Sequence, residues 1–176
     1  IIMLKKNIVL IGMMGSGKST LGKILAKNLK MNFLDTDLLI EKECKLKIKD
    51  IFQEYGEEYF RKKEEKTVNK ILSKENNSVI ALGGGTFLNK NLQKKILRKT
   101  ISIWLKASFK IIYNRCKNSN HRPLLQNNNS LKNSLKKLIN DRYPIYRKAN
   151  IIIIANKTPK ILCDNIKKKI NKINNL

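Results

Sequence analysis

The sequence predicts an α/β fold of three layers, in which a central sheet of five parallel strands carries helices on both faces. Short apolar runs alternate with longer segments of helical period along the chain, and this alternation is typical of parallel strands joined by crossover helices. The fifth apolar run, Ile151–Ile154, is β-branched throughout, as expected where both faces of a strand are covered. A chain of 176 residues is expected to form a single domain over residues 1–176.

The first half of the chain supplies two of these strands. A buried strand is expected at 8–12 and a helix at Lys18–Leu29, in which Leu21 and Leu25 recur at the spacing of one helix face. The elements expected next are a short strand at 33–35, short helices at 38–45 and 48–55, and a longer helix at 57–74.

The second half begins with a strand at 78–82 that ends in three glycines. A helix at 91–98, a strand at 101–105 and a helix at 109–116 are expected to follow, and then a polar stretch at 117–129. Loops of that length in a compact domain are usually lids or disordered segments. A helical region to about 149 is expected to be interrupted near Pro144, and the last helix is expected to begin near Pro159, a residue favoured in the first turn.

The formal net charge is +25, from 38 Lys and Arg against 13 Asp and Glu. A nucleic-acid partner is one interpretation of this charge. The other is compositional drift, because Lys, Asn and Ile are crowded in every region and the basic residues make no single block. We expect no specific nucleic-acid partner, and we expect the charge to help draw anionic ligands to the site.

The cysteines and the single histidine exclude several kinds of site. Cys44, Cys116 and Cys163 are far apart and show no ligand spacing, so reduced thiols in a cytoplasmic protein are expected. His121 stands alone, which excludes a histidine-rich metal site. No apolar stretch approaches the roughly 20 residues that a membrane span needs, so no membrane partner is expected.

Residues 12–19 read Gly-Met-Met-Gly-Ser-Gly-Lys-Ser and match the phosphate-binding motif G-x-x-x-x-G-K-S/T in full. The motif follows an expected strand and opens an expected helix, which is the context that makes it credible. Its glycines let backbone N–H groups turn toward phosphate oxygens, and the helix N-terminus adds its positive end. Lys18 is expected to reach the β and γ phosphates, and the Ser19 hydroxyl to bind Mg²⁺.

A second acid for the metal is expected at the end of the second strand, where Asp35 and Asp37 flank Thr36. Carboxyl ends of strands in open α/β sheets face the ligand crevice, so one carboxylate could lie toward the metal and the other toward the acceptor. The alternative is that Asp37 caps the helix that begins at Leu38.

Arginines against a lysine-rich background suggest a site for a small carboxylate. Arg61, Arg122 and Arg142 are the candidates, because the guanidinium group grips planar anions with two hydrogen bonds. Glu64 follows Arg61 by three residues and could hold its guanidinium in place; the alternative is a solvated surface pair. The glycines at 83–85 would let the backbone approach a ligand, or form a plain turn.

Together these segments resemble the shikimate kinase family of P-loop kinases, which has the nucleoside monophosphate kinase-like fold with a mobile lid. The resemblance covers about the whole chain and depends on the order and spacing of its segments. These are the phosphate loop at 12–19, Asp-Thr-Asp at 35–37, Phe-Arg-Lys-Lys-Glu at 60–64, the glycines at 83–85, Arg-Pro-Leu-Leu at 122–125 and Arg-Tyr-Pro-Ile-Tyr at 142–146.

The resemblance implies a set of residues for ATP and Mg²⁺. The nucleotide-binding residues that it implies are Gly12, Gly15, Ser16, Gly17, Lys18, Ser19, Thr20, Arg115, Arg122 and Pro159. Arg115 would pack on adenine, and Pro159 would mark the loop beneath that base. Ser19 would bind Mg²⁺ directly and Asp35 through water.

It also implies a substrate site and a catalytic set. The substrate-binding residues are Asp37, Arg61, Gly83, Gly84, Gly85 and Arg142, and the two arginines would grip the carboxylate of shikimate. The catalytic residues are Lys18, Asp37, which orients the attacking hydroxyl, and Arg122, which closes onto the phosphates with the lid. The lid is expected at about 113–127 and the substrate-binding helical region at about 37–64.

The implied reaction is ATP-dependent phosphorylation of the 3-hydroxyl of shikimate, which gives shikimate 3-phosphate and ADP on the route to chorismate and the aromatic amino acids. A cytoplasmic monomer is expected. Two departures from the family pattern are that the lid has no glycine between 117 and 121 and that the loop before Pro159 is short.

Two other functions remain open from the sequence. A kinase for gluconate or for a nucleoside monophosphate would share the phosphate loop, and gluconate is also a polyhydroxylated carboxylate. A P-loop module that binds nucleic acid would explain the charge, but its binding should weaken steeply with salt, and the sequence offers no array of aromatic residues for stacking bases.

The implied role of Arg122 gives a first prediction. Arg122→Ala should lower the turnover number far more than it weakens shikimate binding, because charge on the transferring phosphoryl group is stabilised only during transfer. Steady-state kinetics together with a shikimate titration would measure both quantities, and equal losses in the two would contradict the role.

Overall fold

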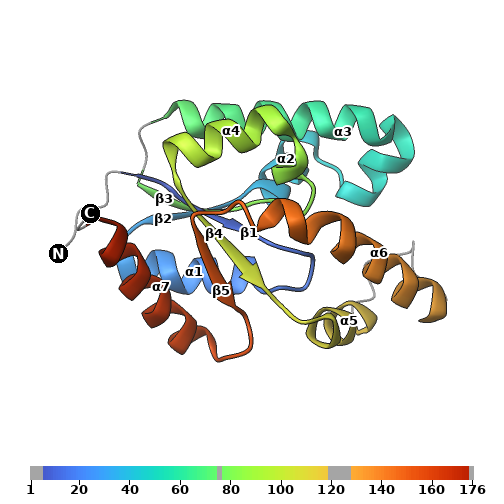
Figure 1. Cartoon of the computed structure of the whole chain (residues 1–176). Helices are drawn as coiled ribbons and strands as arrows, with labels where there is room; N and C mark the ends of the chain where they lie inside the picture. Colours follow the sequence, from blue (N-terminus) through green and yellow to red (C-terminus); the bar gives the residue numbers. More distant parts are fainter. Residues whose placement is uncertain (1–5, 75–76, 119–127, 175–176) are drawn as a thin grey trace.

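The computed structural model describes residues 6–74, 77–118 and 128–174 (Figure 1). At its centre is one sheet of five strands in the order β2-β3-β1-β4-β5, and every neighbouring pair is parallel. The strands are β1 (Ile8–Ile11), β2 (Asn32–Asp35), β3 (Ser78–Ala81), β4 (Ile101–Lys106) and β5 (Ile151–Ile154). The predicted five-stranded parallel sheet is therefore confirmed.

Helices cover both faces of the sheet. They are α1 (Lys18–Leu29), α2 (Thr36–Cys44), α3 (Ile48–Ser73), α4 (Lys90–Lys99), α5 (Phe109–Lys117), α6 (Asn128–Tyr146) and α7 (Pro159–Asn174), with a 3₁₀ turn, η1 (Thr86–Leu88), after β3. In Figure 1, α1 and α7 lie on one face, and α3 and α4 lie on the other. This arrangement confirms the three predicted layers and follows from the burial of apolar side chains on both faces of the central strands.

Strand β1 occupies the middle of the sheet, between β3 and β4. All four of its side chains are at most 1% exposed, which explains the continuous apolar run in the sequence. Leu10 lies opposite both Ala81 of β3 and Ile103 of β4. The phosphate loop that leaves the carboxyl end of β1 therefore starts at the centre of the sheet edge.

Strand β5 corrects one expectation. Ile151 and Ile153 are buried, but Ile152 is half-buried and Ile154 is 53% exposed, so only one face of this strand is fully covered. The reason is its position at the end of the sheet, where β4 is its single neighbour among the described strands. The Nζ of Lys169 in α7 donates a hydrogen bond of 2.9 Å to the Ile152 carbonyl oxygen and occupies part of this open edge.

The interruption expected near Pro144 is also wrong, because α6 continues through that residue to Tyr146. Helical turns even run on beyond it, with the Arg147 amide donating to the Tyr143 carbonyl. Tyr143 and Tyr146, on either side of the proline, pack against Trp104 of β4, with ring centroids 4.9 and 6.0 Å away. Packing of these large rings stabilises the helix where the proline removes one hydrogen bond.

A break predicted between 55 and 57 is confirmed inside α3. Gly56 has φ 78° and ψ 173°, which is not helical, so the chain turns there and a second helical segment begins at Glu57. A small apolar cluster of Ile40, Ile51 and Phe60 joins the two parts of α3 to α2. This cluster fixes the helical region expected to bind substrate beside the main core.

No helix among the described residues is both long enough and apolar enough to cross a bilayer.

The backbone of Gly56 gives a prediction for stability. Gly56→Ala should lower the free energy of unfolding by about 1–3 kcal/mol, because the observed φ and ψ are adopted almost only by glycine. A Cβ at this position would meet no atom within 4 Å, so the loss would come from the backbone and not from a steric clash. Urea denaturation would measure it, with Lys66→Ala at an exposed site of α3 as the control. Equal unfolding midpoints for the two variants would contradict the argument.

Candidate active site

The phosphate loop joins β1 to α1 and is shaped by glycines. Gly15 and Gly17 have φ values of 73° and 94°, which side chains other than glycine rarely tolerate. Lys18 opens α1, and its Nζ donates hydrogen bonds of 2.8 Å to the Gly12 carbonyl and 3.1 Å to the Met13 carbonyl. The ammonium group therefore lies across the loop that the motif predicts to hold phosphates.

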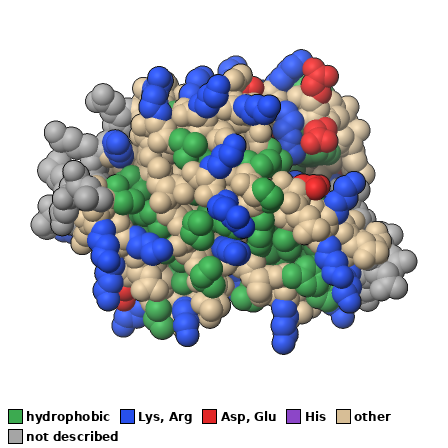
Figure 2. Space-filling view, in the orientation of Figure 1, with side chains coloured by type: hydrophobic (Ala, Val, Ile, Leu, Met, Phe, Trp, Pro, Cys, Tyr) green, Lys and Arg blue, Asp and Glu red, His purple; other side chains and the backbone are tan. Residues whose placement is uncertain are grey.

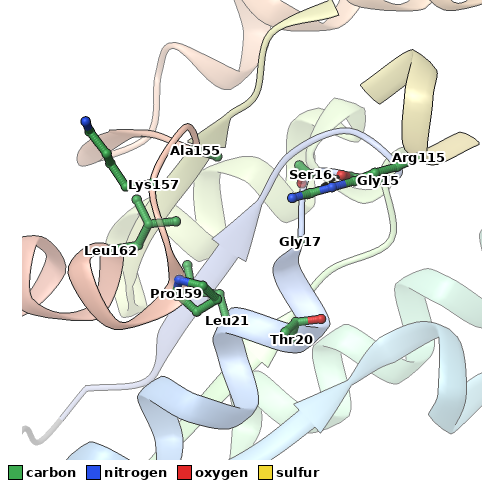
Figure 3. Close-up of a pocket in the computed structure, with 10 residues that line it drawn as sticks. All are labelled: Gly15, Ser16, Gly17, Thr20, Leu21, Arg115, Ala155, Lys157, Pro159 and Leu162. Carbon is green, nitrogen blue, oxygen red and sulfur yellow. Dashed lines mark hydrogen bonds between the residues drawn. The ribbon is translucent and has the colours of Figure 1, made fainter. Parts of the chain in front are cut away.

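A cavity of about 410 Å³ opens beside this loop (Figure 3). Its lining brings together six residues that the sequence had predicted for the nucleotide, namely Gly15, Ser16, Gly17, Thr20, Arg115 and Pro159. Four further lining residues, Leu21, Ala155, Lys157 and Leu162, were not predicted. The helical spacing of Leu21 indicates a core residue, and its side chain is also buried. Ala155 and Lys157 lie in the loop just before Pro159, and Leu162 lies in the first turn of α7, so the position of Pro159 is the one sequence signal near these three.

Arg115 connects α5 to the phosphate loop. Its Nη1 donates a hydrogen bond of 2.8 Å to the Gly15 carbonyl oxygen, although the two residues are 100 positions apart in the chain. A Cβ added to Gly17 would lie 3.4 Å from the same Nη1. The absence of a side chain at Gly17 thus leaves room for the guanidinium, and Figure 3 shows the Arg115 side chain extending alongside the phosphate loop.

Asp35 lies at the end of β2 and makes two kinds of contact. Its Oδ2 accepts a hydrogen bond of 2.6 Å from the Ser19 hydroxyl. Its Oδ1 accepts from the backbone amides of Asp37 and Leu38, so Asp35 is the N-cap of α2. The alternative that Asp37 caps this helix is therefore wrong, and Asp37 lies in the first turn.

The three glycines after β3 lie against a cluster of charged side chains. A Cβ added to Gly83 would lie 2.6 Å from Asp37 Oδ1 and 2.7 Å from Glu64 Oε1. A Cβ on Gly84 would lie 3.0 Å from Arg142 Nη1, and one on Gly85 would overlap the Arg61 guanidinium. A side chain at any of these positions would displace the charged groups beside it, so the glycines allow the predicted substrate residues to lie together.

Glu64 stabilises this cluster from within the protein. Its side chain is only 4% exposed. Its Oε2 accepts a hydrogen bond of 2.9 Å from Arg61 Nη1, and its Oε1 accepts one of 2.6 Å from the Thr86 hydroxyl. The alternative of a solvated surface pair is therefore wrong. Burial by itself lowers the pKa of the Arg61 guanidinium, but the carboxylates of Glu64 and Glu57 outweigh it and raise that pKa. Sequence reasoning missed Glu57, although its spacing of four residues from Arg61 could have marked it.

Two tyrosines of α6 hold the neighbouring loops. The Tyr146 hydroxyl donates to the Gly84 carbonyl, and the Tyr143 hydroxyl donates to the Ala107 carbonyl. Burial raises the pKa of Tyr143 to about 12; burial also raises that of Tyr146, although the Arg142 guanidinium acts in the opposite direction. Both phenols therefore stay protonated as donors at neutral pH, and α6 positions Arg142 beside the glycine loop.

Part of the predicted site lies outside the described residues. Arg122, His121 and residues 119–127 of the expected lid belong to that part, so their predicted roles stay predictions. The described part of the expected lid is the end of α5, which carries Arg115.

Comparison with known proteins identifies close relatives. The family described as shikimate kinase matches residues 14–172. A shikimate kinase of Sulfurihydrogenibium sp. (strain YO3AOP1) is 43% identical over 168 residues, which are 95% of this chain and 99% of that protein. The structure of shikimate kinase from Acinetobacter baumannii in complex with shikimate superposes with a TM-score of 0.88 at 32% identity, covering 95% of this chain and 93% of that chain.

More distant structures share the fold alone. A gluconokinase from Sinorhizobium meliloti 1021 has a TM-score of 0.60 at 14% identity and covers 96% of this chain and 93% of that chain. Identity at this level indicates the same arrangement of sheet and helices, and it carries no argument about the substrate.

The contacts of Glu64 give a prediction for stability. Glu64→Gln should lower the free energy of unfolding by about 1–3 kcal/mol, because an amide has one acceptor oxygen where the carboxylate accepts from both Arg61 and Thr86. Urea denaturation would measure the loss. Glu58→Gln is the matched control on the same helix, since Glu58 is exposed and pairs with exposed Lys62, and it should leave the midpoint unchanged. The same midpoint in both variants would show that the buried contacts of Glu64 add little.

Proposed function

The chain belongs to the shikimate kinase family, and on that premise we propose that it transfers the γ-phosphate of ATP to the 3-hydroxyl of shikimate. The products are shikimate 3-phosphate and ADP, and the reaction lies on the route to chorismate and the aromatic amino acids. The family match over residues 14–172 and relatives such as the Sulfurihydrogenibium protein at 43% identity support this activity.

One observation carries the proposal. The glycine loop of the charged cluster lies directly beside the phosphate loop: a Cβ placed on Gly84 would lie 3.8 Å from the Gly12 carbonyl oxygen and 3.9 Å from the Met14 amide nitrogen. A nucleotide held by the phosphate loop and an acid held by the arginines would therefore meet at one edge of the sheet. Phosphoryl transfer requires mainly such positioning together with neutralisation of charge.

On the nucleotide side, the residues of the phosphate loop and the cavity bind ATP. Backbone amides of residues 12–19 and the N-terminus of α1 bind the phosphates, and Lys18 turns from the loop carbonyls to the phosphate oxygens. Arg115 and Pro159, which line opposite parts of the cavity, contact the adenine base. Arg122, which lies outside the described residues, would close over the phosphates together with the lid.

The oxygens of Ser19 and Asp35 fit a magnesium ion. They lie 2.6 Å apart, and Mg²⁺ takes oxygen ligands, usually one or two carboxylates together with substrate phosphates and water. The described residues contain no group of three or more His, Cys, Asp and Glu that could hold a metal by themselves, which agrees with an ion shared with the nucleotide. When bound, Mg²⁺ neutralises charge on the phosphate oxygens.

On the acceptor side, Arg61 and Arg142 bind the carboxylate of shikimate, and Asp37 binds its ring hydroxyls. Asp37 orients the hydroxyl that attacks the phosphoryl group and accepts its proton late in the transfer. Gly83, Gly84 and Gly85 have no side chain of their own, so the ring can approach their backbone.

We also propose that the protein is a cytoplasmic monomer without a specific nucleic-acid partner. Figure 2 shows Lys and Arg side chains spread over the whole of the face in view, with no single basic block. A nucleic-acid site should instead gather the basic residues on one face or helix. Cys44 and Cys163 are free thiols, as expected in a reducing compartment.

Asp37→Asn tests the function. The variant should lower kcat for shikimate-dependent ADP formation by about 10²-fold or more, because the amide cannot accept the proton of the attacking hydroxyl. Asp141→Asn, the same change at an exposed site of α6, is the control and should retain activity. A coupled assay for ADP formation would measure kcat of each variant, with shikimate, gluconate and nucleoside monophosphates as acceptors.

The acceptor series separates the possible outcomes. ADP formation that depends on gluconate or on a nucleoside monophosphate, and not on shikimate, would refute the proposed substrate. Shikimate-dependent activity that survives Asp37→Asn would leave the reaction standing and refute the role of that carboxylate.

A further inference from the structure

Arg61 has a second carboxylate partner on its solvent side, and this contact has no role in the reaction described above. We propose that Glu57 is an exchangeable counter-ion of Arg61, which the carboxylate of the acceptor substrate displaces when it binds. Glu57 would thereby set the affinity for substrates that carry a carboxylate. The inference rests on the proposed function, because it takes Arg61 as the residue that binds the substrate acid.

The guanidinium of Arg61 is held from two sides. On the inner side Glu64 accepts from Nη1 at 2.9 Å, and on the outer side Glu57 Oε1 accepts from both Nε at 3.2 Å and Nη2 at 3.0 Å. The Nε and Nη2 donors form one edge of the planar group, which is an edge that a carboxylate engages with two parallel hydrogen bonds. Glu57 therefore occupies donors that a substrate carboxylate could use.

The two glutamates differ in how firmly they are held. The side chain of Glu64 is 4% exposed and is fixed by Thr86, whereas the side chain of Glu57 is 66% exposed. Ion pairs with an exposed partner contribute little net free energy, because water solvates the released carboxylate well. Glu57 can thus leave Arg61 at small cost, and Glu64 cannot.

The charge of the cluster favours exchange over simple addition. Asp37, Glu57 and Glu64 supply three carboxylates around the two guanidinium groups of Arg61 and Arg142. A substrate acid that entered without displacing any of them would add a fourth negative charge beside them, and like charges at close range repel. Release of Glu57 into water keeps the balance of charges as it was before binding.

The local backbone leaves room for this movement. Gly56 interrupts α3, so Glu57 begins the second helical segment, and a Cβ at Gly56 would meet no atom within 4 Å. Because the Glu57 side chain is already 66% exposed, its rotation toward solvent needs no change in the helix. The N-terminal end of a helical segment also favours a carboxylate electrostatically, so Glu57 remains stabilised after its release.

Exchange would also favour acids over neutral alcohols. A neutral ligand offers no charge to replace Glu57, so Arg61 would keep both glutamates and contribute little to binding. Only a ligand with a carboxylate at this edge would gain the strong hydrogen bonds of Arg61.

The test uses Glu57→Gln in the full-length protein. The Kd for shikimate should fall by about two- to five-fold, the range expected from loss of a weak competing ion pair. The Kd for the methyl ester of shikimate, which has no negative charge, should stay the same. The fluorescence of Trp104 can report binding, since it is the only tryptophan and packs on Tyr146, whose hydroxyl donates to Gly84.

Two further variants control for charge alone. Glu58→Gln removes the same charge from the neighbouring position, where the side chain pairs with Lys62, and it should leave both Kd values unchanged. Glu57→Asp keeps the charge but is shorter by one methylene group, so it holds Arg61 less well and should also tighten shikimate binding. Thermal unfolding of each variant would confirm that the fold is retained.

Several outcomes would overturn the inference. Weaker shikimate binding in Glu57→Gln would show that Glu57 stays in place and positions Arg61. An equal gain in Glu58→Gln, or wild-type affinity in the Glu57→Asp variant, would show that only the net charge matters. Absence of shikimate-dependent ADP formation in the wild type is a different result, because it would refute the proposed function itself.

Discussion

Strands β1 and β3 run parallel and side by side, with Leu10 opposite Ala81, and the Leu82 amide continues the pairing by donating to the Leu10 carbonyl. The loops that leave the two strands must therefore emerge next to each other at the same edge of the sheet. One loop is the phosphate loop and the other is the glycine loop at 83–85. Every other feature of the site depends on this adjacency, because it places two binding surfaces within contact of each other.

The glycine loop can serve as one of these surfaces because neighbouring elements fix its backbone by hydrogen bonds and because the loop has no side chains of its own. Tyr146 of α6 donates to the Gly84 carbonyl, Thr36 of α2 donates to the Ala81 carbonyl and accepts from the Gly83 amide, and Glu64 of α3 binds the hydroxyl of Thr86. The contacts of Tyr146 and Thr36 bind backbone groups that would otherwise be unsatisfied in a buried position, and that of Glu64 binds a buried hydroxyl. They also bring three helices to the same point: α2 presents Asp37, α6 presents Arg142, and α3 presents Arg61 together with its glutamates.

The charged groups of the cluster are arranged by burial. Glu64 lies deepest and is fixed from two sides, Arg61 is half-buried beside it, and Glu57 lies in solvent. The affinity of the site for an acid thus depends on two partners of Arg61, the permanent partner Glu64 and the exposed partner Glu57. A buried carboxylate keeps the guanidinium charged and oriented, while an exposed carboxylate can give way to a ligand.

The sequence by itself determined the succession of strands and helices along the chain and the phosphate loop, because periodicity, glycines and motif spacing are local properties of the chain. It also named Asp37, Arg61, Glu64 and Arg142 as candidates, but not Glu57. Tertiary structure alone decided that Asp35 and not Asp37 caps α2, that Glu64 is buried, that α6 passes through Pro144 and that β5 has an exposed face. It also decided that Leu21, Ala155, Lys157 and Leu162 line the nucleotide cavity. These facts depend on which surfaces meet across the sheet, and contacts between residues far apart in the chain, such as Arg115 and Gly15, leave no periodic signal in the sequence.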